Sequence, residues 1–322
     1  MVVYSGKAKD VTLLEDNNVR ITFRDSISAF DGVKKEELNE KGRINCKTSV
    51  ILFELLNRYG FATHYLSQLN DIEMICKNVE IKPVEVVCRN VTAGSFCKRY
   101  GVDNGIEFET PIIEFFLKDD DLHDPLVAKE IAIQLGWITK AESTLMESTT
   151  RAVNQVLSAI FERISLKLVD FKLEFGSTDE GVLIIADEIS ADTMRLWEID
   201  TGEIKDKDRY RKDLGGVIDH YKDVLQRLEE IESYPEISIK STAEITIELK
   251  KSVLDPAGEV TLRSLKRKGY QGVEEVRLGK SAKISFSLTP SPNLQEIIKE
   301  ISDSILSNPL IENYTFDFSS GE

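Results

Sequence analysis

The pattern of apolar and polar positions predicts strands at the start of the chain. Residues 11–14 and 19–23 have the apolar character of short strands, and Asp16-Asn17-Asn18 between them is a typical hairpin turn. Apolar residues at helical spacing predict helices over three segments: 44–59, 143–164 and 213–230. Because helices do not alternate strictly with strands, the pattern favours an α+β fold with antiparallel sheets.

A further β-hairpin is predicted by the runs 166–176 and 182–190, with its turn centred on Thr178–Gly181. In the first run, charged and apolar side chains alternate strictly, so the charged ones share one face of the strand. These charged residues are Asp170, Lys172 and Glu174.

Asp187 is the residue that this hairpin would bring opposite Lys172. In that register Asp187 shares the charged face, although a slip of one residue would move it to the other face. Three carboxylates around one lysine suit Mg²⁺, which keeps waters and phosphate oxygens among its ligands. A solvated sheet face explains the same pattern, so both interpretations stay open at this point.

The last part of the chain shows a different order of elements. Its pattern predicts a strand, a helix, two strands, a helix and a strand: 243–249, 257–268, 273–278, 283–288, 294–307 and 314–318. This βαββαβ order is typical of a small ferredoxin-like domain. The acidic segment before it ends near Ser233-Tyr234-Pro235, a helix-stop signal. We therefore expect two domains, 1–232 and 241–322, joined by a linker over 233–240.

Composition and charge narrow the kinds of protein that this chain can be. It has 322 residues, of which 41% are hydrophobic and 30% charged, and its formal net charge is −15. This acidic balance argues against a nucleic-acid partner, because a protein that binds the phosphate backbone needs a basic face. No apolar run approaches the roughly 18 residues of a membrane span, and the N-terminus lacks the features of a signal peptide. We expect a cytoplasmic protein with reduced cysteines and no membrane partner.

Gly6-Lys7-Ala8-Lys9 lies between two predicted strands and is a candidate phosphate loop. The glycine lets the backbone approach a phosphate group, and Lys7 and Lys9 point to one side and can neutralise it. A basic surface turn has the same sequence, so the motif is weak by itself. Gly279-Lys280-Ser281 resembles the end of a Walker A loop, but Glu274 stands where that loop needs glycine.

Arg89–Ser95 follows a predicted apolar strand and combines arginine, small residues and serine. Such a strand end suits an anionic group held by a guanidinium and a hydroxyl, although an ordinary strand-to-helix turn has the same composition. Arg195 and Arg211 follow the hairpin and either bind an anion or belong to surface ion pairs. From these residues alone we expect an enzyme that uses ATP or another phosphate compound.

A series of short strings along the first part of the chain is informative when the strings are taken together. They are Gly6–Lys9, Ser28–Gly32, Pro83–Asn90, Ala93–Ser95, Phe116–Lys118, His123–Pro125, Val169–Gly176, Asp187-Glu188, Asp192, Arg195–Trp197 and Asp206–Arg209. In this order the strings resemble the SAICAR synthetase family (phosphoribosylaminoimidazole-succinocarboxamide synthase). The resemblance covers residues 1 to about 230 without large gaps, and it implies a two-lobed ATP-binding domain.

This resemblance implies an ATP-dependent ligase of purine biosynthesis, with ATP and Mg²⁺ as cofactors. Its substrates would be L-aspartate and carboxyaminoimidazole ribonucleotide (CAIR), and its product SAICAR. A carboxylate is a poor acyl donor, so ATP would first phosphorylate the CAIR carboxylate, and the aspartate amine would then displace phosphate.

The residues to which the resemblance points fall into groups by role. They are Lys172 and Asp170 as catalytic residues; Lys7, Ala8, Lys9, Val86 and Lys118 for ATP; Glu174 and Asp187 for Mg²⁺; Arg89, Ser95, Asp192, Arg195 and Arg211 for CAIR; and Ser28, Asp31 and Gly32 for aspartate.

Residues 241 to about 318 resemble a different family, the PurS-type small subunit of formylglycinamidine ribonucleotide synthase. The strings that carry this resemblance are Val253–Gly258, Gly269–Val273, Val276–Lys280 and Asn308–Tyr314. It implies a dimerising, non-catalytic adaptor that bridges the large and glutaminase subunits of that synthase, and the absence of Cys and His from this part agrees. We expect a homo-oligomer in which a ligase is fused to an adaptor. Two alternatives are an ATP-dependent phosphotransferase with another substrate and a scaffold whose ligase half is inactive.

Overall fold

The computed structural model describes residues 2–29, 32–231, 240–287 and 294–320. The chain divides into two compact units, Met1–Ile237 and Ser238–Glu322. Most of the linker expected over 233–240 lies outside the described residues, and Lys240 is already the first residue of a strand.

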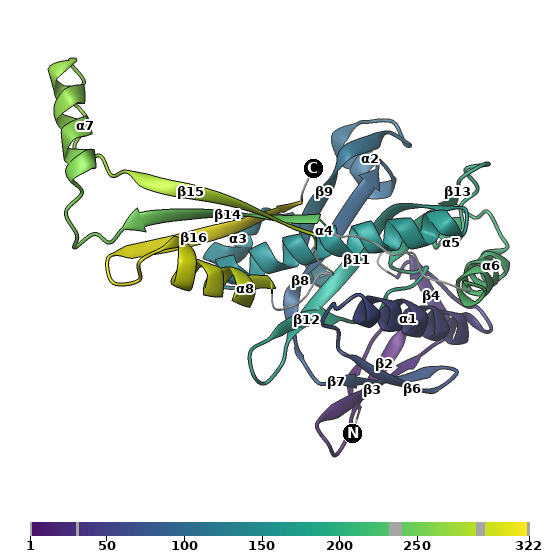
Figure 1. Ribbon diagram of the computed structural model, residues 1–322. Helices are drawn as coiled ribbons and strands as arrows, with labels where there is room; N and C mark the ends of the chain where they lie inside the picture. The colour runs from purple at the N-terminus through teal and green to yellow at the C-terminus, as the bar shows by residue number, and fades with distance from the viewer. Residues whose placement is uncertain (1, 30–31, 232–239, 288–293, 321–322) are drawn as a thin grey trace. The chain divides into compact units, whose positions relative to one another are not determined.

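The first unit begins with an antiparallel sheet (Figure 1). Its strands lie in the spatial order β1 (Val2–Ser5), β2 (Lys9–Leu13), β3 (Asn18–Phe23), β7 (Glu73–Lys77) and β6 (Tyr65–Asn70). The predicted turn between β2 and β3 is present, with Asn17 in the left-handed region at φ 60°. Along β3, Val19, Ile21 and Phe23 are buried and alternate with partly exposed residues, so one face of the sheet is apolar.

The second sheet of this unit is built around the long strand β11. Its strands lie in the order β10 (Leu126–Val127), β9 (Glu107–Leu117), β8 (Glu80–Val91), β11 (Leu166–Ser177) and β12 (Leu183–Ala186), and β13 (Met194–Glu198) also pairs with β11. A small separate hairpin is formed by β4 (Ser26–Ala29) and β5 (Lys34–Glu37). These antiparallel sheets confirm the predicted α+β fold.

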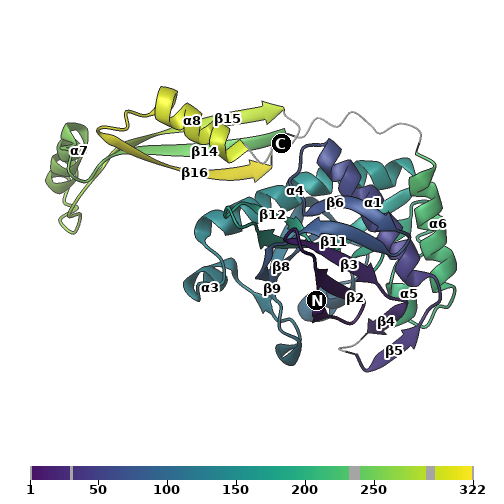
Figure 2. The same cartoon turned by 90° about the horizontal axis from the view of Figure 1, so that it is seen from below.

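The helices of the first unit lie beside the two sheets (Figure 2). They are α1 (Lys41–Arg58), α2 (Gly94–Tyr100), α3 (Lys129–Gln134), α4 (Lys140–Arg163), α5 (Asp208–Arg211) and α6 (Val217–Glu229), with the short 3-10 turn η1 (Asp120–Leu122). A reciprocal capping box of Thr139 and Glu142 starts α4, which packs on β11 and β8. Helix α6 begins later than the predicted residue 213, because Gly215 and Gly216 adopt φ 68° and 62°.

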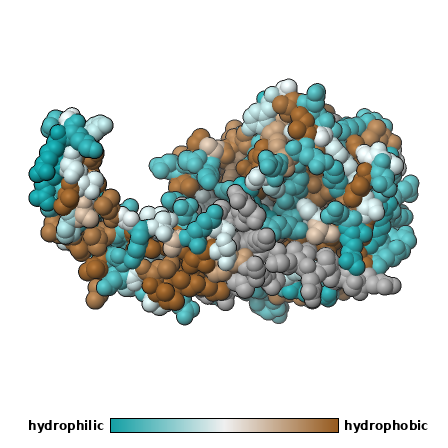
Figure 3. Space-filling model, turned by 45° about the horizontal axis from the view of Figure 1, so that its top comes forward, coloured by the Kyte–Doolittle hydropathy of each residue, from teal (hydrophilic) through white to brown (hydrophobic). Residues whose placement is uncertain are grey.

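The second unit has an antiparallel sheet with β14 (Lys240–Leu249) between β15 (Gly279–Ser287) and β16 (Glu312–Ser320), together with α7 (Pro256–Arg267), α8 (Leu294–Ile301) and a π-helical segment, η2 (Ser302–Leu306). Alternate residues of β14 are buried in a small apolar core with Ile298 of α8: Ala243, Ile245 and Ile247. Figure 3 shows further apolar surface on this unit. Among its apolar side chains, Ile305 and Leu310 are 75% and 83% exposed.

The strand predicted over 273–278 is absent, and so the second unit lacks the full βαββαβ order. That segment is irregular and pairs with no strand of this sheet, in which β14 pairs with β15 along one edge and with β16 along the other. Hydrogen bonds tie it instead to the loop before α7. The Leu278 amide donates to Asp255, and Arg277 donates to the carbonyl oxygens of Leu249 and Lys250.

Candidate active site

A pocket of about 720 Å³ lies between the two sheets of the first unit. Lys7, Ala8 and Lys9 line it from the loop between β1 and β2, together with apolar residues of β2 and β3. Lys118, at the end of β9, lines it from the second sheet. The candidate phosphate loop therefore faces a pocket rather than open surface.

Lys9 is one of the charged residues on the floor of this pocket. Its Nζ lies 2.5 Å from an oxygen of Asp187 and 2.9 Å from an oxygen of Glu188. Burial alone would lower the pKa of Lys9, but the neighbouring Asp187 raises it well above its usual range. Burial likewise opposes the charge on Asp187, yet Lys9 and Lys172 hold the pKa of that carboxyl well below its usual range. Both groups are therefore ionised at neutral pH.

Lys172 of β11 extends this charged floor toward β8. Its Nζ lies 2.7 Å from Glu174 and 2.8 Å from Glu85, and Lys118 forms a further ion pair with Glu174. Burial and Asp187 oppose ionisation of Glu174, but Lys172 and Lys118 lower the pKa of this carboxyl below its usual range. The alternating charged face predicted for β11 thus lines a pocket and is not a solvated surface.

Asp187 reaches this floor by a route that the hairpin pattern did not predict. The β11–β12 ladder places Glu174 opposite Ala186, which differs by one residue from the predicted register of Lys172 opposite Asp187. With that slip, continued alternation would point Asp187 to the other face. Strand β12 ends at Ala186, however, and Asp187 adopts φ 68°. The turn out of the ladder brings its carboxylate to Lys9.

Glu174 and Asp187 are carboxylates that could hold a divalent cation in this pocket. Each influences the ionisation of the other, and both lie near the same lysines. Mg²⁺ prefers such oxygen donors and is usually bound through one or two carboxylates plus substrate phosphates. Among the described residues, no group of three or more acidic, histidine or cysteine side chains is placed to hold a metal. The pair fits a cation that takes its other ligands from a bound phosphate compound.

A second pocket, of about 400 Å³, adjoins the first. Several residues line both pockets: Lys7, Glu85, Asp124, Lys172, Asp192, Thr193 and Lys207. Two further lining residues of the second pocket come from the β4–β5 hairpin, Ser28 from β4 and Gly32 from the turn that follows it. Asp31, which was expected with them, lies outside the described residues.

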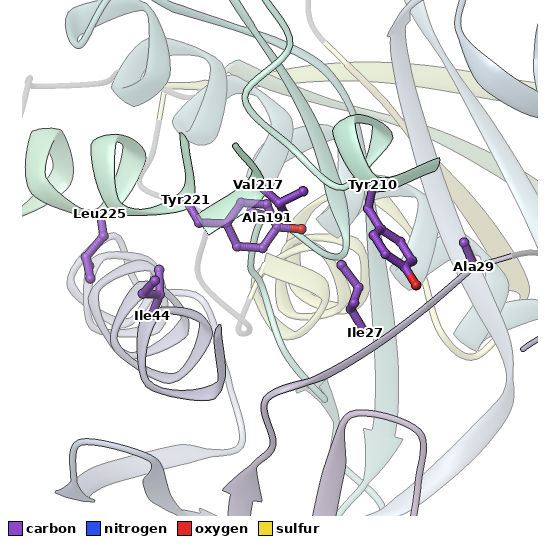
Figure 4. Packing of buried hydrophobic residues seen from close by; sticks show 8 residues of the cluster. All are labelled: Ile27, Ala29, Ile44, Ala191, Tyr210, Val217, Tyr221 and Leu225. Atoms are coloured by element: carbon purple, nitrogen blue, oxygen red, sulfur yellow. The ribbon is translucent and has the colours of Figure 1, made fainter. Parts of the chain in front are cut away.

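A buried apolar cluster holds the β4–β5 hairpin in place beside this second pocket (Figure 4). Its members come from β4, α1, α5, α6 and the segment before β13: Ile27, Ala29, Ile44, Ala191, Tyr210, Val217, Tyr221 and Leu225. Each buried side chain of Leu or Ile size contributes about 1.5–3 kcal/mol. The hairpin is also tied to α5 by Lys34, whose Nζ donates to the Tyr210 carbonyl at 2.5 Å.

Arginines and carboxylates alternate in a series of ion pairs, of which Asp170, Arg195 and Arg211 line the second pocket. Asp170 lies 3.1 Å from Arg89 and 2.7 Å from Arg195, while Asp208 lies 3.0 Å from Arg195 and 2.6 Å from Arg211. Arg195 and Arg211 line the pocket, as the resemblance predicts for ligands of CAIR. Asp170 accepts hydrogen bonds from the guanidinium groups of Arg89 and Arg195. It therefore orients Arg195 in the pocket and is itself held by Arg89.

Three residues expected at the site line neither pocket. Arg89 is 3% exposed and lies behind Asp170, and Ser95 is exposed in the first turn of α2. Val86 is fully buried in β8, whereas its neighbours Glu85 and Val87 line pockets. Successive residues of a strand point to opposite faces, so Val86 belongs to the core.

Gly94 explains why small residues follow β8. It adopts φ 56°, and a Cβ at this position would collide with the guanidinium group of Arg195. The string Ala93-Gly94-Ser95 therefore makes room for an arginine that comes from β13. Sequence reasoning had assigned the string to the ligand itself.

Asp192 lines both pockets, but other parts of the protein also engage it. Its carboxylate lies 2.7 Å from Nζ of Lys41 and accepts a hydrogen bond of 2.8 Å from the Tyr221 hydroxyl. Sequence reasoning missed Lys41, which is 1% exposed at the start of α1. No local signal marks it, because the partner that permits its burial is far away in the sequence.

The apolar wall of the first pocket was also missed. Val11, Val19, Val79 and Ile81 line it and offer a surface suited to a flat heteroaromatic ring. Alternation along β2 and β3 marks Val11 and Val19 as inward-facing. The alternation does not predict whether this inward face lines a pocket or packs into the core.

The fold and the site together define a class of protein. It is an α+β enzyme with two adjoining pockets, each lined by lysines and carboxylates. Residues 2–228 match the family described as SAICAR synthetase, and the chain belongs to this family. Phosphoribosylaminoimidazole-succinocarboxamide synthase from Streptococcus pneumoniae is 47% identical over 231 residues, which make up 71% of this chain and 98% of the relative.

Solved structures agree with this assignment. The crystal structure of phosphoribosylaminoimidazole-succinocarboxamide synthase from Ehrlichia chaffeensis matches with a TM-score of 0.70 and 41% identity, covering 72% of this chain and all of that one. A SAICAR synthetase in complex with ADP matches with a TM-score of 0.69 and 39% identity, covering 73% of this chain and 99% of that one.

The second unit matches a different family. Residues 242–320 match PurS, described as phosphoribosylformylglycinamidine (FGAM) synthase. The predicted combination of the two families in one chain is thereby confirmed. Within the described ranges, no helix combines the length and apolar character that a membrane crossing needs.

Proposed function

We propose that this protein is an ATP-dependent ligase that joins L-aspartate to the carboxylate of CAIR and forms SAICAR. The observation that carries the proposal is the pair of adjoining pockets with Lys172 on their common boundary, in a chain of the SAICAR synthetase family. Such a boundary is where a phosphoryl group can pass from a nucleotide to a second substrate.

The first pocket would bind ATP. Its apolar wall suits adenine, and Lys7, Lys9 and Lys118 are within the same pocket to neutralise the phosphates. The relative in complex with ADP supports this assignment. Glu174 and Asp187 would hold Mg²⁺, which supplies positive charge between the phosphates and the substrate carboxylate when it is bound.

The second pocket would bind CAIR and the amino acid. Arg195 and Arg211 present guanidinium groups, whose paired N–H donors suit phosphate and carboxylate. Asp192 lies beside them, and Arg89 acts through Asp170. Ser95, exposed at the start of α2, is available to a ligand that extends beyond the pocket.

The reaction would take place in two steps. First, an oxygen of the CAIR carboxylate attacks the γ-phosphorus of ATP, the bond to the leaving oxygen breaks, and ADP and an acyl phosphate form. The aspartate amine then attacks the acyl carbon, inorganic phosphate leaves, and the amine nitrogen loses a proton. Lys172 stabilises charge on the phosphoryl group that is transferred. Holding the reactants together supplies about 7 kcal/mol or more of the barrier reduction.

An omission assay tests the proposed reaction. ADP release and SAICAR formation would be measured with ATP, Mg²⁺, CAIR and aspartate, leaving out each in turn, and dependence on all four is expected. Glu174→Gln, which removes a charge that faces Lys172, is expected to lower kcat/KM by about 100-fold or more. ADP release without aspartate would favour a phosphotransferase, and no turnover at all would favour a scaffold.

The second unit would serve as a non-catalytic adaptor for the large and glutaminase subunits of FGAM synthase, and would assemble as a homo-oligomer. Its match to the PurS family and its exposed apolar side chains, among them Ile305 and Leu310, support an interaction role. Residues 241–322 contain neither Cys nor His, in line with a unit that does no chemistry of its own.

A further inference from the structure

Lys207 is a basic residue of the site to which sequence reasoning gave no role. It precedes the short helix α5, its backbone amide donates to the Ala191 carbonyl, and its partly buried side chain lines both pockets. Among the described residues, no hydrogen bond or ion pair engages its Nζ. By contrast, Lys9 and Lys172 each lie within 3 Å of two carboxylates.

The neighbouring charged groups already have partners. Asp192 is the acid with the strongest influence on Lys207, but it is paired with Lys41 and accepts a hydrogen bond from Tyr221. Arg211 is paired with Asp208. Lys207 is thus a cation on the common boundary of the two pockets whose Nζ forms no hydrogen bond or ion pair with the described residues, although its charge, together with that of Lys41, lowers the pKa of Asp192.

The surroundings of Lys207 favour an anionic ligand there. Burial lowers the pKa of this lysine below its usual range, and the cations Arg211 and Lys41 lower it further against the pull of Asp192. A bound carboxylate would relieve that repulsion and supply an acceptor for the ammonium group.

The position of Lys207 in the fold connects it to the β4–β5 turn. Figure 4 shows Tyr210 of α5 beside Ile27 and Ala29 of β4, and Lys34 of β5 donates to the Tyr210 carbonyl. The β4–β5 hairpin, with Ser28 and Gly32, and the start of α5 therefore meet at the same pocket. The arginines of that pocket suit phosphate through their paired donors, whereas a lysine offers a compact point charge.

We infer that Lys207 binds a carboxylate of the amino-acid substrate, on the boundary of the two pockets. This inference rests on the proposed ligase function and assigns the amino-acid site a cation that the expected turn residues do not supply. Held there, the amino acid has its amine close to the place where the acyl phosphate forms.

Steady-state kinetics of the full chain test this role. Lys207→Met removes the charge while keeping the length of the side chain, and Lys207→Arg keeps the charge. We expect Lys207→Met to raise KM for aspartate about 10- to 100-fold, the usual effect of losing a hydrogen bond to a charged group. KM for ATP and for CAIR should stay within a few-fold of the wild-type values, and Lys207→Arg should recover most of the loss. Lys167→Met, at a lysine that lines neither pocket, is the matched control.

Two substrate analogues separate carboxylate binding from a structural role. L-Asparagine has an amide in place of the side-chain carboxylate, and the α-amide of aspartate has one in place of the α-carboxylate. The wild-type protein should discriminate against both. In Lys207→Met, discrimination against one of them should disappear, because the cation that distinguished that carboxylate from an amide is gone. A merely structural loss would lower activity with all three amino acids by the same factor.

Several results would overturn the inference. These are an unchanged KM for aspartate in Lys207→Met, an equal rise in KM for all three substrates, or full discrimination against both amides. A wild-type chain that forms no aspartate-dependent product would instead show that the proposed ligase function fails, and the inference with it. An active wild type with an unaffected variant removes the role of Lys207 alone.

Discussion

The arrangement of the site depends on charged residues that are buried in pairs. Lys41 and Asp192 are 1% and 5% exposed at their side chains and lie 2.7 Å apart. Removing one partner of such a pair leaves an uncompensated charge in the interior, which costs about 3–5 kcal/mol. The same reasoning applies to Lys9 with Asp187, so substitutions here affect stability as well as ligand binding, and each variant needs a folding control.

His64 gives a prediction about pH at the level of one residue. It is 2% exposed, contacts Phe53 edge-on and Cys76 through its ring nitrogen, and burial lowers its pKa from 6.5 to about 4. Between these values the unfolded chain binds a proton that the folded chain does not, so stability falls as the pH falls through this window. The loss from this group between pH 7 and pH 5 is about 2 kcal/mol.

Urea unfolding at pH 7 and at pH 5 measures this contribution. The free energy of unfolding of His64→Gln, whose side chain does not titrate, should fall by about 2 kcal/mol less than that of the wild type over the same interval. Equal losses in the two proteins would show that His64 is not held neutral by its burial.

Single residues show both the reach and the limit of sequence reasoning. Lys172, Glu174 and Lys9 could be predicted, since strand alternation and a glycine-lysine loop are local signals. Lys41 and Lys207 could not, because their roles depend on groups that only the fold brings near them. Arg89 resembles a ligand in the sequence but is enclosed by carboxylates in the structure.

At the scale of elements, the turn between β8 and α2 shows how a backbone conformation positions a side chain. Gly94 adopts φ 56° and leaves the space that the Arg195 guanidinium occupies. Gly101 ends the same helix at φ 65°, but a Cβ there would meet nothing within 4 Å. The two glycines therefore share the backbone requirement and differ in what a side chain would displace.

Gly94→Ala and Gly101→Ala form a matched pair for this reason. Both place a side chain in the left-handed region, at a cost of about 1–2 kcal/mol each. Gly94→Ala alone should displace Arg195 and raise KM for CAIR about tenfold or more, as expected when a charged hydrogen bond is lost. Comparable KM values for CAIR in the two variants, measured at saturating ATP and aspartate, would contradict this role of Gly94.

Helices and strands were predicted well where a local sequence pattern specifies them. They were predicted poorly where the pairing of one strand with another determines the structure. The long periodic helices α1 and α4 and the hairpin of β2 and β3 follow from the local pattern of apolar and turn residues. The register of β11 and β12 differs by one residue from the prediction, and 273–278 is not a strand. Both outcomes depend on how a segment pairs with another strand, and the local sequence pattern does not determine this pairing.

At the scale of the whole molecule, the chain joins two units that match different families. The curated relative from Streptococcus pneumoniae aligns over 98% of its own length with the first part alone. That relative is therefore about as long as the first unit, and both pockets are lined by residues of the first unit only.

Removal of the second unit is expected to leave the ligase reaction intact. A chain that ends at residue 231 should form SAICAR with kcat/KM within a few-fold of the full chain, because no residue of the two pockets is lost. It should no longer bind the FGAM synthase subunits in size-exclusion chromatography, whereas the full chain should. A large fall in kcat/KM in a folded truncated chain would show that the second unit supports catalysis.

With the proposed roles of these residues, the lysine–carboxylate pairs on the floor of the first pocket would also couple the binding of one ligand to the binding of another. A phosphate group that takes over Lys9 or Lys172 leaves Asp187 or Glu174 without its counter-charge, and so increases the attraction of these carboxylates for a divalent cation. By thermodynamic reciprocity, a cation on the carboxylates frees the lysines and strengthens phosphate binding by the same factor. In the proposed ATP site, these ion pairs would thus make nucleotide and metal binding cooperative, in a protein whose net charge alone would repel the nucleotide.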